Sequence, residues 1–278
     1  MKRTIVGVVV VAGMVQLATT PAQAATKIDP VKALTSELAP GRAVNVRSTV
    51  KVTFARDLVT TSDLEGTIGF GSRGATASDV AQTLRYSKKL LRNLMRANPE
   101  ETEALQEGPI RMISSEDASY VSGPVVDAAL PQGTSWVRYG RTKLPASNLL
   151  LEVLEPATLK TLLTHRTSYR DGVLKGSIRT SKLAAVSSSF ASRFGTRFKS
   201  GRDGKISYTL RLGPTGLVER LYAKAVLPRA KGSVHIESSS RYSDWGRQVT
   251  VLLPLRGDVI DREEVADDVP YQAPGIWN

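Results

Sequence analysis

Three glycines could form a nucleotide-binding loop. Gly69, Gly71 and Gly74 have the spacing GxGxxG within "GTIGFGSRGATASDV". In dinucleotide-binding proteins these glycines follow a continuously apolar strand and open a helix, and an acidic residue follows about twenty positions later. Here the preceding segment alternates between apolar and polar residues, and positions 88–92 read "KKLLR". We therefore predict that the glycines mark a bent strand end and a loop, and that the protein uses no cofactor.

Nucleophilic catalysis would need a base that titrates near neutral pH. His165 and His235 are the two histidines, and both lie in segments predicted to be strands. The sequence contains no Gly-x-Ser-x-Gly motif, and the serines at 187–189 have no base near them in sequence. The acidic residues between 261 and 268 lack the spacing of a calcium loop. The residues predict neither an enzyme nor a metal site.

The first 24 residues have the three parts of a secretory signal peptide. Lys2 and Arg3 precede an apolar run over 5–17, and Ala22-Gln23-Ala24 suits cleavage. The chain has no cysteine, so it has neither a site for a lipid anchor nor disulfides. We expect an exported protein that is secreted or associated with the cell wall and is not lipid-anchored.

The chain is strongly basic. It carries 38 Lys and Arg against 26 Asp and Glu, a formal net charge of +12. Outside a cell such a charge favours anionic membrane surfaces or cell-wall polymers as partners, more than nucleic acid. One functional hypothesis is therefore a basic module that binds the cell envelope by charge, without a lipid cavity.

Periodicity predicts a few helices inserted among many strands. We expect helices over 25–40, 149–163 and 182–198, and a hairpin over 165–181 that turns at Asp171-Gly172. Residues 78–107 have a helical period, although 78–86 fits a strand equally well. Alternation predicts strands over 43–54 and 63–71, and through most of the last third, where 233–246 and 247–254 would pair. Three short strands are predicted at 110–114, 118–123 and 135–140. Strands in series argue for an α+β fold with a large antiparallel sheet.

Five segments, taken together, resemble a known family. They are "LPQGTSWVRYG", "LLEVLEPATLKTLLTH", "YRDGVLKGSIRTSKL", "YTLRLGPTGLVERL" and "YSDWGRQVTVLLPLRGDVID". Their order and spacing resemble the LolA-like carriers of actinobacteria, of the LppX and LprG type, over residues 44–261. The resemblance implies one domain over 25–260. It also implies a strongly curved antiparallel sheet, a half-barrel, closed by helices over an apolar cavity. The acidic, proline-containing residues 261–278 predict an irregular tail.

Members of that family carry acylated molecules or lipoproteins across an aqueous compartment. The resemblance carries no catalytic residues with it, and this chain lacks the cysteine that commonly anchors family members. The implied partner is a lipid or a lipidated molecule.

Six apolar residues could line such a cavity: Val50, Val52, Ile68, Phe70, Leu210 and Leu212. Burying each methylene of a lipid chain against them would be worth about 0.8 kcal/mol. Three basic residues at the rim could meet an anionic headgroup: Lys88, Lys89 and Arg92. The same apolar residues could equally fill a solid core, because alternation predicts burial and not an empty space.

Overall fold

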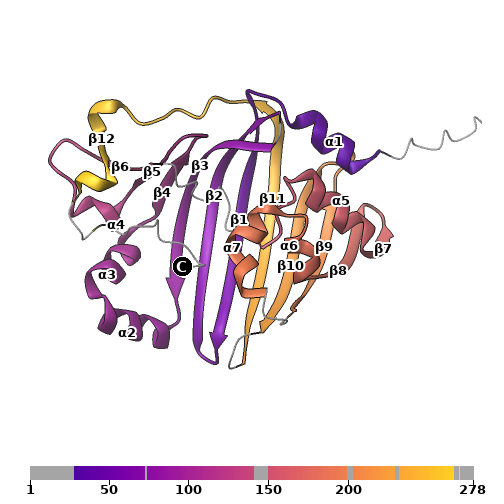
Figure 1. Cartoon of the computed structure of the whole chain (residues 1–278), viewed down its shortest axis with the longest axis horizontal. Helices are drawn as coiled ribbons and strands as arrows, with labels where there is room; N and C mark the ends of the chain where they lie inside the picture. The colour runs from indigo at the N-terminus through magenta and orange to yellow at the C-terminus, as the bar shows by residue number, and fades with distance from the viewer. Residues whose placement is uncertain are drawn as a thin grey trace, which may run out of the picture.

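The structure is a computed structural model, which describes residues 28–72, 74–140, 150–198, 203–228, 232–265 and 269. It consists of one large curved sheet with several helices (Figure 1). The proposed signal peptide lies outside the described residues, and so does most of the proposed tail.

Twelve strands form the sheet in the order β12-β6-β5-β4-β3-β2-β1-β11-β10-β9-β8-β7. Neighbouring strands are antiparallel except β12 and β6, which are parallel. The strands are β1 (Arg42–Ala55), β2 (Leu58–Gly71), β3 (Gly74–Tyr86), β4 (Ile110–Ser114), β5 (Ser119–Ser122), β6 (Trp136–Tyr139), β7 (Arg166–Arg170), β8 (Val173–Arg179), β9 (Lys205–Leu212), β10 (Val218–Pro228), β11 (Ser233–Gln248) and β12 (Val259–Asp261). The predicted α+β class with an open, curved sheet is confirmed, whereas the enclosed apolar cavity stays a prediction.

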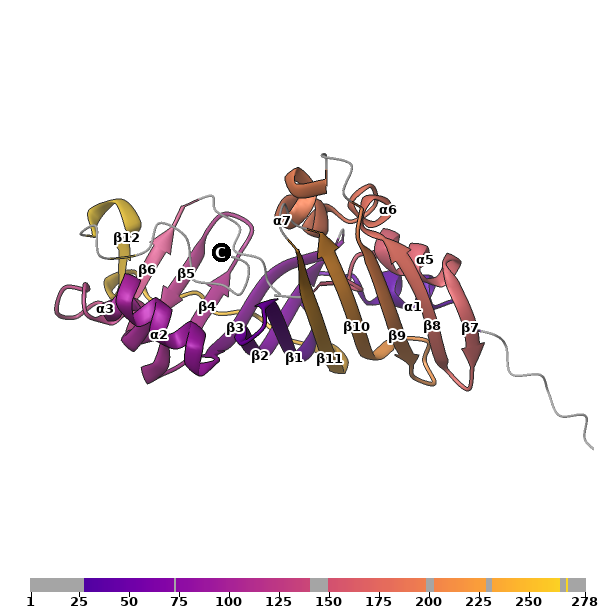
Figure 2. The ribbon, with the colours of Figure 1, turned by 90° about the horizontal axis from the view of Figure 1, so that it is seen from below.

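The helices are short and connect or cover the strands. They are α1 (Pro30–Glu37), α2 (Lys88–Ala97), α3 (Pro99–Glu107), α4 (Pro124–Asp127), α5 (Pro156–Thr164), α6 (Thr180–Ala184) and α7 (Ser188–Phe198), with 3-10 turns at Arg256–Asp258 and Arg262–Glu264. Figure 2 shows α6 and α7 on one side of strands β9–β11. We call this buried side of the sheet the inner face and the opposite side the outer face.

The central strands follow from strict alternation. In β1 the even-numbered residues from 44 to 52 are buried, while Arg47, Thr49 and Lys51 are exposed. Side chains of a strand point alternately to its two faces, so this pattern fixes which residues face inward. The same parity continues through the hydrogen-bonded partners in β2 and β11.

The glycine-rich motif lies in a hairpin and not before a helix. Gly69 and Gly71 end β2, and Gly74 begins β3 with φ +140°. Residues 78–86 belong to β3, so of the two predictions for this stretch the strand is right, and the helices begin only at Lys88. Ser87 marks the change, because its side chain accepts a hydrogen bond from the backbone N–H of Leu90 and caps α2.

Three predicted elements differ in extent from those of the structure. The predicted helix over 149–163 starts only at Pro156, where proline suits the first turn of a helix. The predicted helix over 182–198 is two helices, α6 and α7, separated around Ser187. The predicted pairing of 233–246 with 247–254 is wrong, because β11 runs unbroken to Gln248 and pairs with β1.

A bulge explains why the turn signal at Asp244-Trp245-Gly246 does not reverse the chain. Asp244 and Gly246 both have positive φ, as in a turn. The ladder between β1 and β11 shifts register there and then resumes at Ala43 opposite Arg247. Extra residues on one strand are thus absorbed as a β-bulge.

Within the described residues, no helix is both long enough and apolar enough to cross a membrane.

Candidate functional site

The six predicted ligand-binding residues all lie on the inner face. Their exposed fractions run from 0% for Leu210 to 7% for Leu212. Val50 and Val52 lie on β1, Ile68 and Phe70 on β2, and Leu210 and Leu212 on β9. They form two groups, because β11 and β10 lie between β1 and β9. Their predicted contact with a ligand stays a prediction.

Aromatic side chains close one end of the inner face. The Phe70 ring stacks on Trp245 with centroids 6.1 Å apart, and Trp245 lies 6.0 Å from the Tyr242 ring. The indole N–H of Trp245 donates to the carbonyl oxygen of Val218 at 3.0 Å. Phe70 is therefore held by packing and is not free to move without Trp245.

The six residues line neither of two surface hollows found among the described residues. One of about 470 Å³ lies beside α6 and includes His165, Lys182 and Asp203. The other, of about 580 Å³, lies on the outer face and includes Arg47 and Arg241.

The inner face also carries polar side chains, which the sequence analysis did not single out. They form what we call the inner polar patch: Ser48, Ser62, Ser78, Gln82, Ser114, Ser119, Ser238 and Ser240, all buried. The strand ladders place Ser48 opposite Ser240 and Val50 opposite Ser62 and Ser238. The patch therefore extends across the centre of the sheet, beside the predicted apolar residues of β1 and β2.

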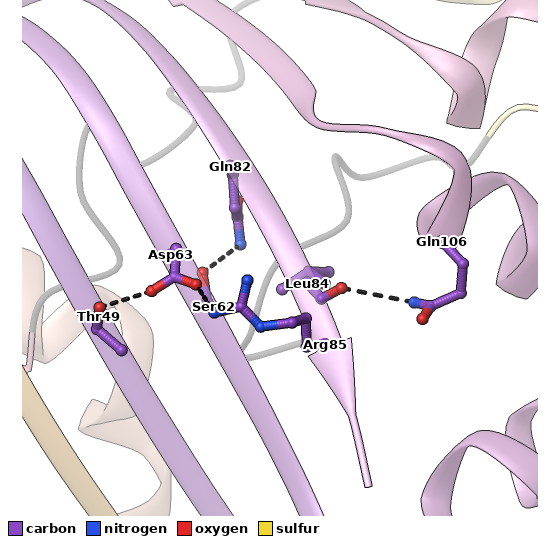
Figure 3. A network of polar contacts seen from close by, with 7 residues as sticks. All are labelled: Thr49, Ser62, Asp63, Gln82, Leu84, Arg85 and Gln106. Carbon is purple, nitrogen blue, oxygen red and sulfur yellow. Dashed lines mark hydrogen bonds and ion pairs between the residues drawn. The ribbon is translucent and has the colours of Figure 1, made fainter. Parts of the chain in front are cut away.

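Several members of the inner polar patch bond to one another. The Ser48 and Ser240 hydroxyls are 3.1 Å apart, and those of Ser114 and Ser119 are 3.0 Å apart. The Gln82 side-chain amide donates to the Ser62 hydroxyl at 3.0 Å (Figure 3).

Two atoms of the inner polar patch have no hydrogen-bond partner in the described structure. They are the Ser78 hydroxyl oxygen and the Gln82 Oε1 atom, on residues 0% and 1% exposed. A buried polar atom left without a partner costs about 1–3 kcal/mol, so native proteins seldom leave one unsatisfied. Both residues lie on β3, four positions apart, which is about 13 Å along a strand.

The Tyr242 hydroxyl, on β11, is another buried polar group. Burial raises the pKa of Tyr242 well above 10, and the Glu152 carboxylate raises it further. Its hydroxyl lacks a partner of good hydrogen-bond geometry, although the nearby Ser240 hydroxyl opposes part of the pKa rise. The phenol is therefore neutral throughout the physiological pH range.

Glu155 fastens the helices that cover the inner face. Its carboxylate accepts hydrogen bonds from the hydroxyls of Ser187 at 2.5 Å and Thr158 at 2.7 Å, and from the backbone N–H of Ser189 at 3.0 Å. Burial alone would raise the pKa of Glu155, but these hydrogen bonds outweigh burial and hold it below 4.5. One carboxylate thus joins the first turn of α5 to the first turn of α7.

Arg193 of α7 is a cation near the Glu155 carboxylate. Burial lowers the pKa of Arg193, while Glu152 and Glu155 act in the opposite direction. The two carboxylates thus offset part of the cost of burying the guanidinium. Tyr208 ties the same cover to β9, because its buried hydroxyl donates to the carbonyl oxygen of Leu162 in α5 at 2.6 Å.

The three predicted headgroup residues lie elsewhere. Lys88, Lys89 and Arg92 are exposed on α2, beyond the end of β3, and line neither hollow (Figure 1). The structure therefore does not bring them onto the inner face, and their role with a headgroup stays a prediction.

Of the two histidines predicted to lie in strands, one does and the other does not. His235 lies in β11, as predicted, but His165 follows the end of α5, where its Nδ1 lies 3.0 Å from the Thr161 carbonyl oxygen. The described residues contain no group of three or more Asp, Glu or His that could hold a metal ion.

The inner polar patch had a signal in the sequence. Ser48 interrupts the apolar series of β1, and Ser238 and Ser240 occupy the inward positions of β11. These interruptions could have been read as buried polar positions. That they lie side by side depends on the strand register, which the sequence does not show.

Comparisons with known proteins assign no family. No family model matches the chain, and no curated protein matches it. Among solved structures, a de novo designed transmembrane β-barrel is similar over 74% of this chain and 98% of its own, at 5% identity and a TM-score of 0.18. A likeness this weak carries no argument about fold or function.

Proposed function

We propose that this protein is an exported, non-enzymatic carrier that shelters a lipid or another apolar ligand against the inner face of its sheet. The observation that carries the proposal is the pair of buried, unpartnered polar atoms on β3, beside an apolar wall. A core that serves packing alone gains nothing from such atoms, since each one costs stability. A ligand with its own polar group would remove that cost.

The chemistry of the two atoms indicates the kind of ligand. Gln82 offers its carboxamide oxygen, and Ser78 offers a hydroxyl that both donates and accepts. A hydroxyl or amide group of the ligand would satisfy either of them. The inner polar patch consists of serines and one glutamine, so its residues carry no positive charge that would favour a phosphate. The apolar residues of β1 and β2 would then contact the acyl chain.

The proposed ligand is thus an amphiphile whose neutral polar group is buried with its chain. Lys88, Lys89 and Arg92 would act only on a headgroup that projects from the site beyond β3. Their exposure on α2 suits this more peripheral role.

Lipid carriage is tested with protein purified from a host that secretes it. Native mass spectrometry and lipid extraction should show an amphiphile bound to the mature chain. Val52→Trp fills inner-face space and should lose most of that lipid. Lys51→Trp adds the same ring to the outer face of the same strand and should keep it.

Circular dichroism and a thermal melt establish that both variants fold. A wild-type protein without lipid, or equal lipid in the two folded variants, would refute the proposal.

A further inference from the structure

Four arginines form a row across the outer face of the sheet. The register places Arg211 of β9 opposite Arg220 of β10, Arg220 opposite Arg241 of β11, and Arg241 opposite Arg47 of β1. We call these four residues the arginine row. All four are exposed, and with strands about 4.8 Å apart the row extends over about 14 Å.

Such a row is costly for the fold. Like charges directly opposite each other on neighbouring strands destabilise a sheet, and this row contains three such pairs in succession. Elsewhere on the same face opposite charges meet: Lys224 pairs with Glu237 at 2.8 Å, and Arg111 pairs with Asp79 at 2.8 Å. The arginine row is therefore an exception to the pattern of its own surface.

The two ends of the arginine row are neutralised and the middle is not. Arg47 pairs with Glu65 at 2.9 Å, and Arg211 lies 3.5 Å from Glu219. In the described part of the chain, Arg220 and Arg241 have no carboxylate within ion-pair distance. Two adjacent guanidinium groups thus face solvent without compensation.

The surroundings of the arginine row suit an anionic chain. The next outward positions on one side are Thr209, Tyr222, Ser239 and Thr49. On the other side lies the hollow of about 580 Å³, which Arg47, Arg241 and Arg247 line together with polar groups. Two carboxylates, Glu65 and Asp79, also line it, and each is paired with an arginine, Arg47 and Arg111 respectively. Hydroxyl and amide groups next to guanidinium groups are the usual donors to phosphate oxygens.

The width of the arginine row decides between a membrane and a linear polymer. The cationic strip is one residue wide, and acidic side chains lie close to it at Asp63, Glu65 and Glu237. A flat anionic membrane would meet these carboxylates as well as the arginines. A single chain that crosses the strands along the row would meet the arginines and the hydroxyls beside them.

We infer that the arginine row is a binding site for a linear polyanion of the phosphodiester or polyphosphate type, independent of the proposed inner-face ligand. The polymer lies across strands β9, β10, β11 and β1, with successive anionic groups on successive guanidinium groups. Planar guanidinium groups bind two oxygens of one phosphate at once, which favours arginine over lysine for this role.

Long-chain inorganic polyphosphate, labelled for fluorescence anisotropy, is a suitable probe. Wild-type mature protein should bind it with an affinity that falls as salt rises. The double variant Arg220→Gln/Arg241→Gln should weaken binding roughly ten-fold at low salt and reduce the slope of log K against log salt by about 1.4 to 1.8.

The matched control removes the same charge from two other exposed arginines. Arg56 lies in the turn between β1 and β2, and Arg256 lies in the 3-10 turn before β12. Arg56→Gln/Arg256→Gln should leave affinity within about two-fold of wild type, because distant exposed charges are screened.

Three outcomes would overturn the inference: no binding of polyphosphate, equal losses in the two double variants, or tighter binding to anionic phosphatidylglycerol vesicles than to polyphosphate. Equal losses would mean that net charge alone attracts the polymer, and preference for vesicles would make a membrane the occupant. Lipid content is measured on the same samples. Loss of polyphosphate binding with normal lipid content would leave the carrier proposal untouched, and the reverse result would leave the arginine row untouched.

Discussion

Replacing Gln82 with leucine tests whether the inner face carries unsatisfied polarity. Leucine is close to glutamine in size and is well suited to a site only 1% exposed. The change removes the unpartnered Oε1 acceptor and also removes the 3.0 Å hydrogen bond from the Gln82 amide to Ser62 (Figure 3). The free energy of unfolding should therefore report the balance of these two effects.

The balance favours the leucine variant when no ligand is bound. Relieving the buried acceptor is worth about 1–3 kcal/mol, and the lost hydrogen bond costs about 0.5–1.5 kcal/mol. At the midpoints of these ranges the net gain for Gln82→Leu is about 1 kcal/mol. In a chain of this length that gain raises Tm by about 2–4 °C.

Urea unfolding and thermal melts of delipidated mature protein measure this difference. Gln106→Leu is the control, because the Gln106 amide donates to the Leu84 carbonyl oxygen at 3.5 Å and the residue is exposed (Figure 3). Its effect should stay within about 0.5 kcal/mol. A loss of more than about 1 kcal/mol in Gln82→Leu, at an unchanged m-value, would refute the reasoning about the unpartnered atom.

Bound ligand should favour the wild type over Gln82→Leu. If an amphiphile supplies a donor to Gln82, adding lipid raises Tm more in the wild type than in Gln82→Leu, since at one lipid concentration the tighter-binding protein is stabilised more. An equal rise in the two proteins would mean that the ligand does not contact Gln82.

Three further changes test the structure itself. Gly66→Ala should lower the free energy of unfolding in urea by more than about 3 kcal/mol, because the φ of Gly66 is +154° and the added Cβ would lie 2.1 Å from a backbone oxygen. In the control Gly74→Ala the added Cβ meets no atom within 4 Å, so the cost should be about 1–2 kcal/mol of backbone strain. Equal costs would contradict the close approach at Gly66. Glu155→Gln should lower the free energy of unfolding most at neutral pH. The difference from wild type should shrink as pH falls below about 4.5, because a carboxylate with a lowered folded-state pKa stabilises the fold only while it is ionised. A difference in unfolding free energy that stays constant into the acid range would exclude this role of Glu155. Tyr208→Phe should lower the free energy of unfolding by about 1 kcal/mol through loss of the bond to Leu162, with no change in m-value, and no measurable loss would show that water replaces the phenol.

Elements with a strict two-residue period could be predicted from the sequence. The alternation of Ile206, Tyr208 and Leu210 predicts β9, and Asp171-Gly172 predicts the β7–β8 turn, where both residues have positive φ. In these stretches each local preference agrees with the final fold, so little depends on distant parts of the chain.

Elements decided by distant pairing could not be predicted in the same way. Residues 78–86 fit both periods, and the choice of strand follows from their pairing with β2 and β4. The turn signal at 244–246 is locally correct, because Asp244 has φ +54°, but pairing with β1 carries β11 through it. Tertiary contacts override local preference in both cases.

The same distinction, between properties of one strand and properties of strand pairing, applies to the site residues. Burial of Val50 and Leu210 could be predicted, because burial of alternating residues is a property of one strand. The inner polar patch and the arginine row could not, because each is defined by which residues of different strands lie opposite one another. No single strand of the arginine row carries more than one of its members.

Strand geometry lets one sheet present two unrelated surfaces. On β1, Val46 and Ser48 face the interior while Arg47 between them faces solvent, and the same holds for Ser240, Arg241 and Tyr242 on β11. Adjacent residues thus serve opposite faces without sharing contacts, since successive side chains of a strand point apart. A ligand inside would be sensed through packing and buried polar groups, whereas a polyanion outside would be sensed through salt-dependent charge. A protein that holds an apolar cargo within could therefore be retained by an anionic polymer without giving up that cargo, because neither kind of binding uses a residue of the other.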